Sequence, residues 1–354
     1  MSMLTALRYC LIAMACCVLR TSLCSAQECD PDGASYVSFE VPQSTNTFPL
    51  SVNDSLNVTG SYTDTAGATH GFVREAYGEI TSFDVPGSVH TEPVGINDVD
   101  EIAGSYQDVS GSSRGFIRYR DGSIATFNPG GSGGATIVTG INIRGIVTGY
   151  FTTTNTVPPD HGFVRARHGT ITTFDISGGD ELFPESINAL GEITGSYYFE
   201  GDTQVGGFVR SPGGTLTTFA FQAGIVPIAI NAEGAVAGWY GTTTGFHGFV
   251  RHRDGWIATF DPPGTILTQY TSINQAGAVT GSYRIQKAEP PPAPPTLVTH
   301  GFLRTPQGVL DSFDPPGSYG TMATSINDFG VIAGYYSNAT APGAVGFLRI
   351  RRVD

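Results

Sequence analysis

The chain repeats one pattern of apolar and polar positions along most of its length. Each copy has a β-branched residue followed by Asn, a Gly seven residues after that Asn, and an aromatic residue within two positions of the Gly. A Gly-Phe-aliphatic-Arg segment follows, and in six copies a Gly comes four residues and a Phe nine residues after its Arg. The pattern occurs seven times with a period of about 45 residues, which is typical of repeat architectures. Its asparagines are Asn53, Asn97, Asn142, Asn188, Asn231, Asn274 and Asn327.

Short apolar segments between turn residues predict four strands in each copy. Asn-x-x-Gly turns are expected to join the first strand to the second, because Asn and Gly tolerate tight-turn conformations. Two-residue turns such as Asp121-Gly122 are expected to join the third strand to the fourth. This register would place Phe116 opposite Phe127, as an aromatic pair that packs between neighbouring units. Four antiparallel strands repeated radially predict a β-propeller.

The two ends of the repeat array predict how it closes. The last copy lacks a fourth strand after Arg349, and residues 37–42 match residues 81–86, which form a fourth strand in the first copy. We therefore expect the N-terminal strand to join the last blade, which leaves no exposed sheet edge. The predicted fold class is all-β, a closed seven-bladed β-propeller of four-stranded antiparallel blades. It would occupy residues 27–354 as one domain.

Composition narrows the classes of partner. The 354 residues include 47 Gly and 22 Pro, which interrupt helices, and only 14% of the residues are charged. The formal net charge is -13, and Lys287 is the single lysine. Nucleic acids and anionic membranes bind basic surfaces, so we expect neither as a partner.

The first 26 residues have a different character. Arg8 precedes an apolar run at residues 9–19, and small residues at 24–26 fit a signal-peptidase site. We expect a cleaved secretory signal with a mature start near Gln27. The run is shorter than the about 20 apolar residues of a transmembrane helix. The expected product is a secreted or periplasmic monomer, without membrane insertion once the signal is removed, in which Cys29 is the one remaining cysteine.

The repeated stretch also resembles a known family. An Ile-Asn-x-x-Gly-x-Ile-x-Gly-x-Tyr segment followed by His-Gly-Phe-aliphatic-Arg is similar to the extracellular HAF repeats of exported bacterial proteins. The resemblance covers residues 36–352, and this chain has Gly-Phe where that family usually has Ala-Phe. The family has no assigned reaction, so the resemblance implies export and a repeat architecture.

Connection lengths predict which end of the propeller binds a ligand. The spacing across both hairpins is constant, whereas the connection between the second and third strands varies. From Gly to Gly it spans 10 residues between Gly238 and Gly248 and 20 between Gly281 and Gly301. These connections and those from the fourth strand to the next first strand share one end, and variable loops on a rigid scaffold often carry binding sites. We expect a ligand on this variable-loop face.

Three residues in the predicted fourth-to-first connections are candidates for that face: Glu92, Glu185 and Tyr270. Paired carboxylates could act as acid and base in glycoside cleavage, whereas in an acidic protein they could equally be solvated loop residues. The favoured interpretation is a non-catalytic exported module that binds a glycan, a polymer or a protein. The alternatives are a propeller-type hydrolase or lyase acting on extracellular polysaccharide, and a structural component of the envelope.

Polar residues that recur in every copy are expected to serve the fold. We expect the Asn of Ile-Asn to form the first turn through its side chain. The Arg of Gly-Phe-aliphatic-Arg should do one structural job in each blade, and the acidic residue after the fourth-strand Phe should cap a turn or pair with an Arg. Histidines precede Gly-Phe in four copies, on separate blades, so no metal site is predicted. No cofactor or nucleophile motif occurs, and we predict no cofactor.

Overall fold

The computed structural model describes residues 33–153, 161–177, 181–198, 205–287, 296–341 and 343–351 of the chain, without the side chains of residues 270 and 271. The expected signal at residues 1–26 and Cys29 therefore lie outside the described residues. Every regular element in these ranges is a β-strand, which confirms the all-β prediction.

The strands form antiparallel sets of four in which each strand pairs with the next along the chain, and the first strand of the chain completes the last set. One set comprises β2 (Ser44–Val52), β3 (Val58–Asp64), β4 (Thr69–Arg74) and β5 (Ile80–Phe83), and the next β6 (Ser88–Ile96), β7 (Ile102–Asp108), β8 (Ser113–Arg118) and β9 (Ile124–Phe127). Then come β10 (Thr136–Ile141), β11 (Val147–Phe151), β12 (His161–Arg165) and β13 (Ile171–Phe174), followed by β14 (Glu181–Ile187), β15 (Ile193–Tyr198), β16 (Gly206–Arg210) and β17 (Leu216–Phe219). Further along are β18 (Ile225–Ile230), β19 (Val236–Thr242), β20 (Gly245–Arg251) and β21 (Ile257–Phe260), and β22 (Thr265–Ile273), β23 (Val279–Lys287), β24 (Thr296–Arg304) and β25 (Leu310–Phe313). The last set is β26 (Ser318–Ile326), β27 (Ile332–Asn338), β28 (Val345–Ile350) and β1 (Ser35–Phe39).

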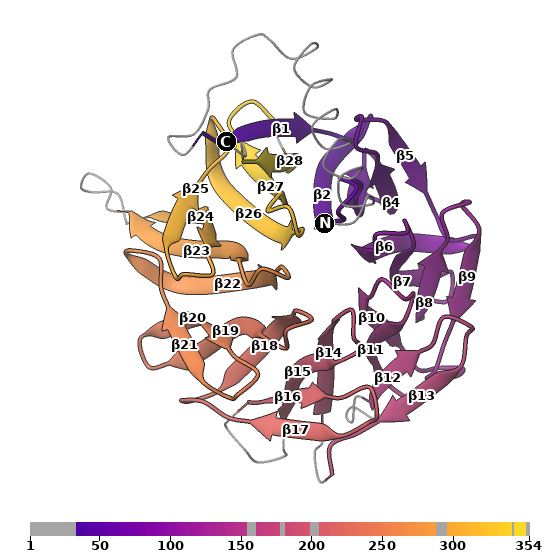
Figure 1. Ribbon diagram of the computed structural model, residues 1–354. Coiled ribbons are helices and arrows are strands. Elements are labelled where there is room, and N and C mark those ends of the chain that lie inside the picture. Colours follow the sequence, from indigo (N-terminus) through magenta and orange to yellow (C-terminus); the bar gives the residue numbers. More distant parts are fainter. Residues whose placement is uncertain are drawn as a thin grey trace, which may run out of the picture.

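The sets are arranged radially around a common centre (Figure 1). The first strand of each set is innermost: β2, β6, β10, β14, β18, β22 and β26. Each inner strand contacts the inner strands of the sets on either side, and β26 contacts β2. Because neighbouring strands are antiparallel, the two hairpin turns of every set lie at one end, which we call the constant-turn end. The remaining connections lie at the opposite, variable-loop end.

The second hairpin of each set has a different register from the one predicted. Phe116 of β8 lies opposite Thr126 of β9, and Gly115 lies opposite Phe127. The predicted pairing of Phe116 with Phe127 is therefore wrong by one residue. Since side chains alternate between the faces of a strand, this shift moves Phe127 to the other face relative to Phe116.

The geometry of the turn explains this shift. The Tyr119 N–H donates to the Ser123 carbonyl, and the Gly122 N–H donates to the Tyr119 carbonyl. Gly122 has a φ of 86°, in the left-handed region that glycine tolerates. A type I turn followed by such a residue makes the loop one residue longer than the two-residue turn assumed from the Asp-Gly pair.

The new register packs aromatic rings between neighbouring sets. A Cβ on Gly115 would lie 2.3 Å from Cζ of Phe127, so the glycine makes room for this ring. The Phe127 ring then meets Phe163 of the next set at a centroid distance of 5.7 Å, just as Phe83 meets Phe116 at 6.1 Å. Aromatic packing between units occurs as predicted, but the partners belong to different sets. The third-strand rings are fully buried: Phe72, Phe116, Phe163, Phe208, Phe249, Phe302 and Phe347.

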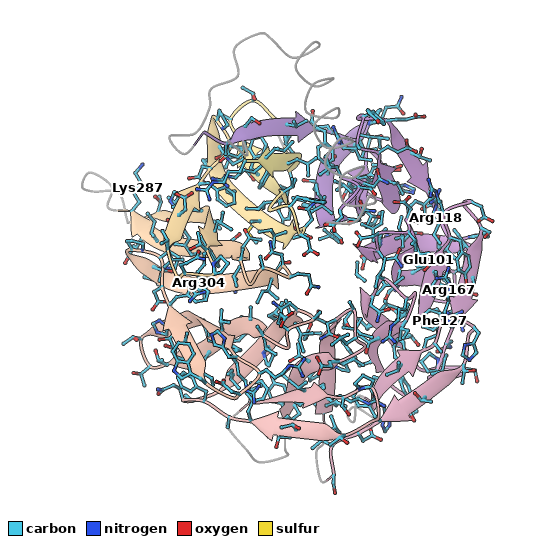
Figure 2. The ribbon with its side chains drawn as sticks, in the orientation of Figure 1. Glu101, Arg118, Phe127, Arg167, Lys287 and Arg304 are labelled. Atoms are coloured by element: carbon cyan, nitrogen blue, oxygen red, sulfur yellow. The ribbon has the colours of Figure 1, made fainter. Side chains whose placement is uncertain are left out.

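The Arg at the end of each Gly-Phe-aliphatic-Arg segment stabilises the same interface. Its guanidinium lies over the fourth-strand Phe of the preceding set, as with Arg118 over Phe83 at 5.0 Å and Arg304 over Phe260 at 5.3 Å. Figure 2 shows Arg118 and Arg304 on different sets around the molecule. The arrangement occurs in all seven copies. These arginines therefore join neighbouring sets, in agreement with the structural role predicted for them.

Candidate functional site

The repeated asparagines form a continuous series of hydrogen bonds at the constant-turn end. The Asn53 Oδ1 accepts the N–H groups of Ser55 and Asn57 in its own turn, which confirms the turn-forming role predicted for this residue. Each Asn Nδ2 also donates to the main-chain carbonyl of the Asn in the following copy, at 2.8 to 3.1 Å. The last of them, Asn327, donates to the Asn53 carbonyl. Sequence reasoning missed this second role, although an Asn at one position in every copy was a signal for it.

A cavity of about 240 Å³ lies inside this series of asparagines. Five of the asparagines line it, together with Val52, five of the isoleucines that precede an Asn, and several residues that follow one. Three of the following residues are acids, Asp54, Asp98 and Asp328, whereas Ile143 and Ala189 are apolar. The cavity therefore lies at the constant-turn end, opposite the end where the sequence predicts the ligand.

The acids around this cavity bind main-chain groups of neighbouring turns. The Asp54 N–H donates to Oδ1 of Asp98, the Asp328 N–H donates to Oδ1 of Asp54, and the Gln275 N–H donates to Oδ1 of Asp328, each within 3.0 Å. Burial raises the pKa of Asp328, and the charge of Asp98 adds to the rise, against the opposing effect of the Gln275 N–H. These carboxylates therefore link successive turns, as the asparagines do.

The structure places the three predicted candidates inside strands and not in the connections before them. Glu92 lies in β6, Glu185 in β14 and Tyr270 in β22, and the side chain of Tyr270 is outside the described residues. The predicted location in loops is wrong because these inner strands begin well before their Ile-Asn pairs.

Glu92 and Glu185 occupy different positions in their strands. Glu92 is exposed and lies opposite Ser105 of β7. Glu185 is the extra residue of a β-bulge between Pro184 and Ser186. The inner strand β10 lies between β6 and β14, and within the described residues no hydrogen bond or ion pair joins the two carboxylates. The two carboxylates therefore come from inner strands that are not neighbours.

Glu185 has an unusual environment for a carboxyl group. Burial raises its pKa to about 7. Burial also raises the pKa of Tyr198, and the charges of Glu181 and Glu185 raise it further, which places both acids near this phenol. Counting back from the Asn of each copy, the matching positions hold aliphatic residues or Thr: Leu50, Val94, Thr139, Ile228, Thr271 and Thr324.

The four histidines before Gly-Phe pair with the Asp that follows the fourth-strand Phe of the same set. Typical are His70 with Asp84 at 2.9 Å and His247 with Asp261 at 2.8 Å. His161 and His300 make the same contact with their own Asp partners. The His partner corrects the expectation that these acids cap a turn or pair with an Arg. The joint occurrence of both residues in four copies was the available signal.

The described residues bear on metal binding and on membrane-spanning helices. Among the residues that the structure describes, no group of three or more His, Cys, Asp or Glu is arranged to hold a metal ion. The same residues include no helix with the length and apolar character needed to cross a membrane.

Exposed apolar side chains occur at the variable-loop end of four sets: Val89 and Val109 on the set of β6 to β9, and four larger side chains on three successive sets. The four larger side chains are Phe246 of β20 (42% exposed), Ile266 of β22 (42%), Leu297 of β24 (60%) and Tyr319 of β26 (61%). Phe246 pairs in parallel with Leu267, the residue after Ile266, so the first two lie at one junction between sets. A parallel bridge between β24 and β26 joins the next two sets in the same way. We call these four residues the rim patch.

Solved structures with this architecture share little sequence with the chain. Virginiamycin B lyase from Staphylococcus aureus matches with a TM-score of 0.54 and 14% identity, over 90% of this chain and 99% of that chain. The β-propeller domain of the Trilobed protease from Pyrococcus furiosus gives 0.56 and 6%, over 86% and 97%. Puromycin hydrolase gives 0.56 and 10%, over 85% of this chain and 52% of that chain, so the chain spans about half of that protein.

These likenesses establish the fold class. The chain has the fold of a β-propeller, as the repeat predicted. At such low identity the likeness extends to the fold alone. No protein-family model matches the chain, and no curated protein matches its sequence.

Proposed function

We propose that this protein is an exported, seven-bladed β-propeller of the HAF-repeat type that binds an extracellular ligand at its variable-loop end without catalysis. Three contacts between the two ends of the array support a closed ring. β1 pairs with β28 from Ser35 and Ile350 to Phe39 and Gly346. Arg74 of β4 lies over Phe39 of β1, and Asn327 donates to the Asn53 carbonyl.

Export and a monomeric state are proposed from the sequence. The signal-like segment with Arg8 and the predicted start near Gln27 support secretion into the periplasm or beyond. The net charge of -13 supports a partner other than nucleic acid or an anionic membrane surface.

The rim patch is the observation that carries the binding proposal. Exposed large apolar side chains cost solubility, and grouped ones often mark a site that a partner covers. The rim patch lies at the end where the connections differ between copies, so its side chains are not required by the repeated packing. Aromatic and aliphatic side chains next to polar loops suit the apolar faces of sugars or a protein surface. A glycan, another polymer or a protein is therefore the proposed ligand.

A direct test screens the mature protein, from residue 27, on glycan arrays and in polysaccharide pull-downs. A rim variant, Phe246→Ser with Tyr319→Ser, should lower the retained ligand by about tenfold or more, because two apolar contacts are lost. The matched control is Trp256→Ser with Val309→Ser, since these residues are as exposed but lie in second-hairpin turns at the constant-turn end. Loss of binding in the control but not in the rim variant would move the site to the other end and refute the proposal.

A hydrolase or lyase acting on extracellular polysaccharide is the second candidate function. It is favoured by Glu185, because a carboxyl group with a pKa of about 7 suits a general acid. Its weakness is that Glu92 is exposed and lies on another set, with the inner strand β10 between β6 and β14. Product analysis of every bound polysaccharide separates the two functions. Cleavage that disappears in Glu185→Gln would make the protein an enzyme, and the absence of any ligand would favour a structural role in the envelope.

A further inference from the structure

Glu185 is a charged residue at a position that is uncharged in every other copy of the repeat. The other copies place Leu, Val, Ile or Thr there. Withdrawing a carboxylate from water is unfavourable unless a partner compensates it. Within the described residues the Glu185 side chain has no hydrogen bond or ion pair with the protein. The bulge in which it lies recurs between the first two strands of the other sets, where the bulged residue is uncharged. A side chain that weakens the fold at one copy alone is a candidate for a function.

The strands packed around Glu185 carry few basic residues that could neutralise its carboxylate. β14 packs against β10, β11, β12, β15 and β18, and only β12 among them carries basic groups. Of these groups, His161 pairs with Asp175, and Arg165 lies over the ring of Phe127.

The other titratable groups on these strands are acids and phenols. They are Glu181 on β14, Tyr150 on β11, and Tyr197 and Tyr198 on β15. The connecting segments 154–160, 178–180 and 199–204 contain no Lys, Arg or His, and they include four acidic residues in their sequences. A positive charge would compensate the Glu185 carboxylate. The basic groups on the surrounding strands are engaged with Asp175 and Phe127 instead.

Aromatic rings occupy the same part of the set. Phe183, two residues before Glu185, meets Tyr150 of β11 edge to face at a centroid distance of 5.2 Å. It meets Tyr198 of β15 in the same way at 5.8 Å. Glu181 pairs with Tyr198 across the strands, and the charges of both glutamates act on this phenol. Carboxylates beside aromatic rings are the groups that recognise organic ammonium ions, through charge and cation–π attraction.

We propose that Glu185, together with Phe183, Tyr150 and Tyr198, binds an organic cation, namely an ammonium group carried on an apolar body. The Glu185 carboxylate takes the ammonium, and the rings contact the apolar part. This inference goes beyond the proposed function, because it names a second site, on a different set from the rim patch, and the chemical class of its ligand. The carboxylate form holds the cation, so binding strengthens as the pH rises through the titration of Glu185.

The test measures binding of benzylammonium to the mature protein by calorimetry at pH 6 and pH 8. Benzyl alcohol serves as the neutral ligand of similar shape. We expect benzylammonium to bind at least about tenfold more tightly than benzyl alcohol at pH 8, and less tightly at pH 6 than at pH 8. Glu185→Gln should remove the preference for the cation. The matched control is Glu92→Gln, which changes an exposed glutamate on another inner strand and should bind as the unchanged protein does.

Three results would overturn the proposal. They are equal binding of benzyl alcohol and benzylammonium, undiminished cation binding in Glu185→Gln, and no binding up to about 10 mM ligand. Thermal unfolding shows whether Glu185→Gln is folded, and we expect it to be at least as stable as the unchanged protein at pH 8 because it lacks the partly buried, unpaired charge. The rim variant should bind benzylammonium normally, so failure of the rim proposal and failure of the cation site are told apart.

Discussion

The constant-turn end and the variable-loop end are built from the same strands, but their side chains behave differently. At the constant-turn end every copy contributes an Asn that bonds its own turn and the next copy. At the variable-loop end the copies differ in connection length, and side chains such as Tyr319 are exposed. Side chains that recur in every copy, such as the asparagines, hold neighbouring copies together. Side chains found in one copy alone, such as Glu185, have no such packing role.

The largest difference in stability between the two ends is expected when one Asn is replaced at each end. Asn231 is buried, its Nδ2 donates to the Asn274 carbonyl, and its Oδ1 accepts the Ala235 N–H. Asn231→Ala leaves two main-chain groups without these partners and should lower the free energy of unfolding by about 3 kcal/mol. Asn338→Ala, at the partly exposed end of β27, should cost less than about 1 kcal/mol. Urea unfolding measures both.

Equal losses in the two Asn variants would contradict the division between the ends. A cost below about 1 kcal/mol for Asn231→Ala would mean that the neighbouring turns hold their geometry without the bonds between copies. The same experiment on Asn327 examines the bond that reaches the Asn53 carbonyl. We expect the same loss there, because the local geometry is the same.

The sequence predicted the type and order of the elements well because each strand is marked by its own residues. The Asn of the first turn, the Gly seven residues later and the Gly-Phe-aliphatic-Arg segment recur in the same order in every copy, so the strands and their order could be read directly. The register of the second hairpin could not, because Asp121-Gly122 fits both a two-residue turn and the longer turn that the structure adopts. That choice depends on how Phe127 packs against the neighbouring set, which lies far from the hairpin in sequence.

The candidate site was predicted less well than the fold. Glu185 was singled out as an acid near an inner strand, but its environment depends on the strands of neighbouring sets that pack against β14, which the periodicity of the sequence does not reveal. Glu92 was chosen on the same grounds and proves to be exposed, because it lies two residues earlier in its strand relative to the Asn. The cavity within the asparagines was not foreseen, since its wall assembles residues from all seven copies.

A second pair of variants compares a glycine of the repeated motif with a glycine near the variable-loop end. In Gly115→Ala the new Cβ would lie 2.3 Å from the Phe127 ring, so the ring must shift, and we expect a loss of about 2 kcal/mol. In Gly320→Ala the new Cβ meets no atom within 4 Å, so stability should hold or rise slightly. Chemical unfolding of both variants measures the difference. A neutral Gly115→Ala would show that the interface between sets is loosely packed.

The smallest expected effect concerns a pair that occurs in only some copies, His70 with Asp84. Burial alone would lower the pKa of His70, but its hydrogen bonds to Asp84 and Asp64 raise it above the ordinary value. A raised pKa in the folded state means that the protonated His70 stabilises the protein fully below about pH 6.5, and this contribution is lost as the pH rises through the raised pKa. Because the pair is partly exposed, the contribution should stay below about 1 kcal/mol. We therefore expect the stability difference between the unchanged protein and His70→Gln to shrink from pH 5.5 to pH 8, as measured by urea unfolding at each pH. A stability difference that grows with pH would contradict this prediction, because it would mean that neutral His70 is the stabilising form.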